Sequence, residues 1–122
     1  MSARHSHPFE KLRVWGAARQ LVREVYCLTK GFPHSETYGL TSQLNRAAVS
    51  VAANLAEGSA RTSRKDQAHF SQLAYSSLME LTCLLILGVD LEFAASEDEL
   101  RLREQIESLS RQINALRNKQ LS

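Results

Sequence analysis

The sequence has 122 residues, of which 43% are hydrophobic and 23% are charged, and its formal net charge is +2. These values fit one ordinary globular domain and exclude a low-complexity chain. Two prolines and five glycines are too few for a turn-rich β fold, so this scarcity favours long, uninterrupted helices.

Residues 1–8 have no apolar pattern, and we expect a disordered tail there, followed by a first helix over residues 9–30. Apolar residues recur along this helix at intervals of three and four, namely Val14, Ala18, Leu21, Val25 and Leu28. Gly31 and Pro33 end the helix, because glycine suits a left-handed cap and proline cannot continue a helix.

The second helix is expected to begin at Ser35 or Thr41 and to end at Glu57, with Gly58 as its cap. Additional alanines keep this helix slim, so that neighbouring helices can approach it closely. Its apolar face consists of Leu40, Leu44, Ala47, Val51 and Leu55.

Two capping signatures mark the starts of the remaining helices, Ser63 with Asp66 and Ser96 with Glu99. The third helix runs from there to about residue 91 and the fourth to about residue 118, with residues 119–122 frayed. Short connections make consecutive helices antiparallel neighbours. The sequence therefore predicts an all-α, antiparallel up-down four-helix bundle over residues 9–118.

The second half of the third helix is apolar on all sides, since ten of the fourteen residues 78–91 are apolar. A helix in a monomeric bundle buries only one stripe, so the excess apolar surface predicts a homo-oligomer. The residues assigned to its subunit interface are Leu84, Leu85, Leu87 and Leu91.

A polar stripe runs along the second helix at intervals of three and four residues. Its members are Gln43, Arg46, Ser50, Asn54, Glu57 and, past the helix, Arg61. A solvated surface would produce the same pattern. Serine and asparagine are poor helix formers in mid-helix, however, and favour a structural hydrogen-bond network. We assign Gln43, Ser50, Asn54, Glu57, Arg61 and Glu80 to this network.

Charge is unevenly distributed along the chain. Up to Lys65 there are ten basic and four acidic residues, and after it five basic and nine acidic residues. A mixed surface or complementary subunits could account for this, and so could sequence-independent contact with nucleic-acid phosphates. The candidate nucleic-acid contacts are Arg19, Arg23, Arg46, Arg61, Arg64 and Lys65.

No residue pattern points to catalysis, and we predict a protein that is not an enzyme and binds no cofactor and no metal. An unseen catalytic site would most plausibly use Asn54, Glu57 and Arg61. Cys27 and Cys83 lie in apolar runs and are interpreted as small core residues in a reducing compartment. Residues 81–89 are too short to span a bilayer, so we expect a cytoplasmic protein with no membrane contact.

Five segments together resemble the four helix bundle protein family, which is also called the 23S ribosomal RNA intervening-sequence proteins. They are Phe9-Glu-Lys-Leu-Arg-Val-Trp15, Phe32-Pro33, Tyr38-Gly-Leu-Thr-Ser-Gln43, Asn54-Leu-Ala-Glu-Gly58 and the stretch from Ala74 to Leu81. The similarity extends from residue 9 to about residue 117.

The resemblance implies an antiparallel four-helix bundle that assembles as a homopentameric barrel and has no established catalytic activity. A related branch, the accessory variability determinant of diversity-generating retroelements, binds nucleic acid and a reverse transcriptase through a strongly basic surface. The present chain departs from that branch with its net charge of only +2. We therefore expect a homo-oligomeric scaffold that contacts RNA or DNA, or alternatively a protein-interaction module without a nucleic-acid role.

Overall fold

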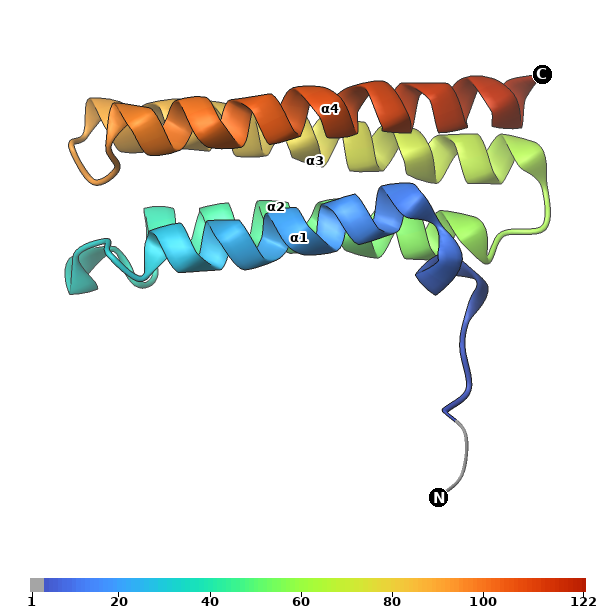
Figure 1. Cartoon of the computed structure of the whole chain (residues 1–122), viewed down its shortest axis with the longest axis horizontal. Helices are drawn as coiled ribbons and strands as arrows, with labels where there is room; N and C mark the ends of the chain where they lie inside the picture. Colours follow the sequence, from blue (N-terminus) through green and yellow to red (C-terminus); the bar gives the residue numbers. More distant parts are fainter. Residues whose placement is uncertain (1–3) are drawn as a thin grey trace.

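The computed structural model describes residues 4–122 and shows four long helices, each antiparallel to the next (Figure 1). They are α1 (Arg13–Thr29), α2 (Leu40–Ser59), α3 (Arg64–Asp90) and α4 (Ser96–Leu121), with short 3-10 turns η1 (Pro8–Lys11) and η2 (His34–Glu36) before α1 and α2. The described residues contain no strand. The prediction of an all-α chain with four helices is therefore confirmed.

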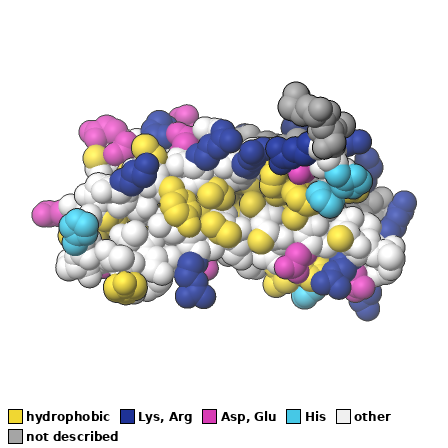
Figure 2. All heavy atoms as spheres, turned by 90° about the horizontal axis from the view of Figure 1, so that it is seen from below, with side chains coloured by type: hydrophobic (Ala, Val, Ile, Leu, Met, Phe, Trp, Pro, Cys, Tyr) yellow, Lys and Arg dark blue, Asp and Glu magenta, His cyan; other side chains and the backbone are white. Residues whose placement is uncertain are grey.

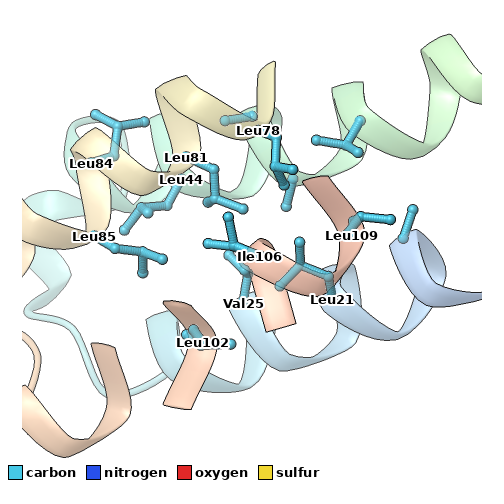
Figure 3. Close-up of a cluster of buried hydrophobic side chains, with 14 of the residues drawn as sticks. Leu21, Val25, Leu44, Leu78, Leu81, Leu84, Leu85, Leu102, Ile106 and Leu109 are labelled. Carbon is cyan, nitrogen blue, oxygen red and sulfur yellow. The ribbon is translucent and has the colours of Figure 1, made fainter. Parts of the chain in front are cut away.

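One hydrophobic core draws buried side chains from all four helices, and Figure 3 shows part of it. α3 packs against both α2 and α4, and α1 packs against the same two helices from the other side. Burying each large aliphatic side chain contributes about 1.5–3 kcal/mol relative to leaving it in water. The largest fully buried side chains are Leu21, Leu44, Leu78, Leu81, Leu85, Leu102, Ile106, Leu109, Ile113, Val25 and Val51.

Gly58 lies inside α2, and the prediction that it caps the helix is wrong. The helix continues to Ser59, and a Cβ atom built on Gly58 would lie 2.9 Å from the Cβ atom of Phe70. Gly58 is therefore a point of close approach between α2 and α3. Gly31 likewise does not take the predicted left-handed conformation, since α1 ends at Thr29 and no described glycine has positive φ.

The two capping signatures have different outcomes. Ser63 caps α3 as predicted, because the Asp66 N–H donates to its Oγ at 3.0 Å. Ser96 does not cap α4: the helix is entered through Ala95, whose side chain makes no cap hydrogen bond. Glu99 is instead buried in the first turn and pairs with Arg103 at 2.5 Å.

The C-terminus differs from the predicted frayed tail, and the predicted disordered tail at the N-terminus differs only at its last residue. α4 continues to Leu121, and the Ser71 hydroxyl donates to Gln120 Oε1 at 2.7 Å, which fixes the last turn. Residues 4–7 are outside regular structure, and the 3-10 turn η1 begins at Pro8, inside the predicted tail. Residues 1–3 of that predicted tail lie outside the described residues.

α3 is the one helix among the described residues that is long and apolar enough to cross a membrane by length and composition. Its most apolar window of 18 residues has a mean hydropathy of 1.5. The apolar part of this helix is therefore longer than the stretch of residues 81–89 considered in the sequence analysis. One such helix is weak evidence for a span, because the core helix of a bundle meets the same criterion.

Exchange of Gly58 for alanine tests the close approach of α2 and α3. Alanine favours helix, but here its methyl group would collide with Phe70, so we expect Gly58→Ala to destabilise the protein by about 1–3 kcal/mol. The matched control is Gly16→Ala in α1, where nothing lies within 4 Å of the added Cβ. That change should stabilise by about 0.5–1 kcal/mol. Urea unfolding measures both, and equal effects would contradict the assignment.

Glu92 occupies the turn after α3 with φ of 64°, the only positive φ among the described non-glycine residues. Phe93 N–H donates to Gly88 O at 2.9 Å across this turn, a geometry that glycine adopts with less strain. We expect Glu92→Gly to stabilise the protein by about 1 kcal/mol in urea unfolding. Glu104→Gly, an equal charge change in the exposed middle of α4, should cost about 1 kcal/mol.

Candidate nucleic-acid and subunit interfaces

Cations from three separate segments gather at one end of the bundle, which we call the basic end. The start of α1, the α2–α3 connection and the C-terminus all lie there (Figure 1), and Arg64 Nη1 donates to Ser122 O at 2.6 Å. Acidic groups lie at the same end, namely Glu10, Glu57, Asp66 and the carboxylate of Ser122, but the cations outnumber them. The exposed cations of the basic end are Lys11, Arg13, Arg61, Arg64, Lys65 and Lys119.

The opposite end is richer in acidic residues. Glu36, Asp90, Glu92, Glu97 and Asp98 lie in or beside the α1–α2 and α3–α4 connections, where Lys30 and Arg101 are the nearby cations. Residues 66–100 contain seven acidic residues and neither lysine nor arginine. The electrostatic potential is therefore expected to be more positive at the basic end than at this one.

The structure divides the six predicted nucleic-acid contacts among three places. Arg61, Arg64 and Lys65 lie together at the basic end, where Arg61 also stacks on Phe70 at 4.5 Å. Arg19 and Arg23 lie along α1, away from that end. Arg46 lies in the second turn of α2, beside Glu80, so these cations do not form one surface.

Three further cations at the basic end are missing from the sequence-based set. Lys11, Arg13 and Lys119 come from chain segments far from residues 61–65, and only the antiparallel packing brings them near. The charge excess of the first half of the chain was a signal for Lys11 and Arg13. No local pattern marks Lys119.

Part of the predicted polar network forms a link between α2 and α3. Ser50 Oγ lies 2.8 Å from Ser77 Oγ, and Asn54 Nδ2 donates to Ser50 O at 2.9 Å and to Ser50 Oγ at 3.1 Å. Ser77 was not among the predicted members. These half-buried hydroxyl and amide groups satisfy one another, so the polar link costs the packed interface little.

The other predicted members do not join this link. Glu57 and Arg61 form an ion pair at 3.9 Å, with side chains 58% and 48% exposed. Gln43 and Glu80 line a hollow of about 310 Å³ with Arg46, and within the described residues their side chains make no hydrogen bond. A catalytic site at this cluster would require an unpaired Glu57 in a deep pocket. Glu57 is instead paired with Arg61 and exposed.

Other chemical features are sparse. The described residues contain no group of three or more histidine, cysteine, aspartate or glutamate side chains that could hold a metal ion. The Ser6 hydroxyl donates to exposed Glu10 at 3.1 Å and lowers the pKa of that carboxyl group. Cys27 and Cys83 are exposed thiols, which corrects their interpretation as core residues.

The predicted subunit interface on α3 needs correction as well. Leu84 and Leu85 are 6% and 1% exposed, because they face α2 and the core of the bundle rather than solvent. Leu87 and Leu91 are 43% and 56% exposed, and Met79 and Ile86 are also open to solvent. We call Met79, Ile86, Leu87 and, directly after the helix, Leu91 the outer face of α3. The excess apolar surface expected on this helix is present: it keeps Leu87 and Leu91 of the predicted set, and Met79 and Ile86 take the place of Leu84 and Leu85.

A second apolar surface lies between α1 and α2. A hollow of about 390 Å³ there has a lining that is almost entirely apolar, and Figure 2 shows hydrophobic side chains along this face with lysine and arginine beside them. At the edge of this hollow, Arg19 Cζ lies 5.5 Å from the centroid of the Trp15 ring. We call this the α1–α2 groove; it is lined by Phe9, Trp15, Arg19, Val22, Arg23, Val49, Ala52, Ala53 and Ala56.

Comparison with known proteins identifies a family and solved structures with a similar fold. A family model described as 23S rRNA-intervening sequence protein matches residues 10–115. A crystal structure from Bacteroides thetaiotaomicron, described as a protein with unknown function from the S23 ribosomal protein family, superposes with a TM-score of 0.75. It shares 16% identity, over 84% of this chain and 96% of that one, so this similarity concerns the fold. No curated protein matches.

Proposed function

Because it belongs to the 23S rRNA-intervening sequence protein family, we propose that this chain is a non-enzymatic, homo-oligomeric scaffold that binds RNA or DNA backbone in the cytoplasm. The observation that carries the nucleic-acid part is the basic end, where three chain segments that bear exposed cations lie at the same end of the bundle. Ribosomal RNA is the first ligand to test, in view of the family's description.

The chemistry of the basic end suits phosphate better than base recognition. Lysine and arginine neutralise phosphates and release counterions, a gain that does not depend on base sequence. Ser63 caps α3 there, and the positive end of the helix dipole adds to the field of Arg64 and Lys65. The cations stand at a bundle end instead of along one helix that could enter a groove, so sequence-independent contact is proposed.

The outer face of α3 supports the oligomeric part of the proposal. Three large apolar side chains exposed on α3, with Leu91 directly after it, leave a surface that water solvates poorly, and such surfaces usually mark an interaction site. A closed ring of five copies, as the family resemblance implies, would cover this surface in every subunit.

A protein-interaction module without nucleic acid is the alternative. The acidic end and the net charge of +2 favour it, because both weaken the attraction of a polyanion to the whole molecule. Capture of a protein partner that survives nuclease treatment, together with no RNA binding, would favour this alternative.

The oligomer is tested by multi-angle light scattering of the purified chain. We expect an oligomer, because the outer face of α3 is not buried within one bundle, and a mass of five subunits is the one that the family resemblance implies. A monomer mass at every concentration would contradict the oligomeric scaffold. The measured mass does not test nucleic-acid binding, so the oligomer and the nucleic-acid binding can be contradicted independently of each other.

Phosphate binding is tested by the salt dependence of affinity for a ribosomal RNA fragment. Lys11 and Lys65 make no ion pair within the described residues, so Lys11→Gln with Lys65→Gln should remove contacts without unfolding. Each lost contact should flatten the plot of log affinity against log salt by about 0.7–0.9 per binding subunit. Lys30→Gln, outside the basic end, is the control, and an equal effect there or no binding at low salt would contradict the proposal.

A further inference from the structure

We propose that the α1–α2 groove of one subunit receives the outer face of α3 from a second copy, so that the subunits join head to tail. This inference rests on the homo-oligomer proposed above and specifies its two surfaces. The groove and the outer face of α3 are distinct parts of the same bundle.

The apolar composition of the two surfaces is complementary. The groove floor is built from the small residues Ala52, Ala53 and Ala56, which leave room between α1 and α2 for side chains from outside. The outer face of α3 supplies long, flexible aliphatic side chains, including Met79 and Leu87. Packing large side chains into a surface of small ones lets helices approach closely and removes both surfaces from water.

Charge favours the same pairing. Arg19 and Arg23 line the groove and make no ion pair within the described residues. The exposed side of α3 carries Glu80 and Asp90, and α3 has no cation after Lys65. Docking the outer face of α3 into the groove therefore brings guanidinium groups that make no ion pair near the carboxylates of Asp90 and Glu80, of which Glu80 also has Arg46 of its own subunit beside it.

Pairing of like surfaces is less favourable. Two outer faces of α3 brought together would place Glu80 and Asp90 of both copies in one contact, and two grooves would do the same with Arg19 and Arg23. Like charges in an interface suppress association. A contact between two different surfaces leaves one subunit with a free groove and the other with a free outer face, so further copies can add until a suitable rotation between them closes a ring.

The test uses two complementary variants with a charge on one surface each. Ala53→Glu blocks the groove, and Leu87→Glu blocks the outer face of α3; both positions are exposed, so the core is undisturbed. Ala115→Glu on the exposed side of α4 is the matched control and should keep the wild-type mass. Thermal unfolding followed by circular dichroism verifies that each variant is folded.

Each blocked variant alone should be a monomer in sedimentation velocity. Mixed in equal amounts, the two retain one intact groove and one intact outer face between them, so the mixture should form a dimer and stop there. A mixture that stays monomeric at concentrations where the wild type is assembled would overturn the pairing, as would normal assembly of Ala53→Glu alone. A monomeric wild type would instead remove the oligomer itself.

Discussion

Burial of α3 is the constraint on which the rest of the structure depends. This helix packs against α2 on one side and α4 on the other, and its buried stripe supplies Leu78, Leu81 and Leu85 to the core. The same helix is apolar beyond that stripe, so the bundle that it stabilises also leaves part of it in contact with water. Folding of one chain and association of several are thus linked through a single element.

The close contact between α2 and α3 explains the unusual composition of α2. The Phe70 side chain packs so closely against Gly58 that a Cβ atom at Gly58 would collide with it. The alanines along α2 have small side chains, so neighbouring helices can also approach the rest of its surface closely. Ser50 and Ser77 then meet across the contact and satisfy each other's hydroxyl groups. Other small residues of α2, namely Ala52, Ala53 and Ala56, open the groove on the side of α1.

The spacing of apolar residues predicted the fold well, because a helix period of 3.6 is imposed by backbone geometry and is visible in one sequence. Leu40, Leu44, Ala47, Val51 and Leu55 are all buried as expected. Which side of an apolar helix faces the core is decided by its neighbours, so Leu84 and Leu85 could not be separated from Leu87 beforehand. For the same reason, only three of the six cations of the basic end were predicted, since residues such as Lys119 join it through tertiary packing. The role of Gly58 depends on Phe70, which lies on another helix.

Separation of charge along the bundle gives each subunit a polarity. Rotational symmetry about one axis leaves the component of that polarity along the axis unchanged from copy to copy. In a ring whose helices run along its axis, every basic end would therefore emerge on the same rim, and every acidic end on the other. A long polyanion bound to one subunit is held close to the basic ends of the other subunits on the same rim. Its effective concentration at those ends is therefore high, and its overall avidity for the ring could exceed its affinity for any single subunit.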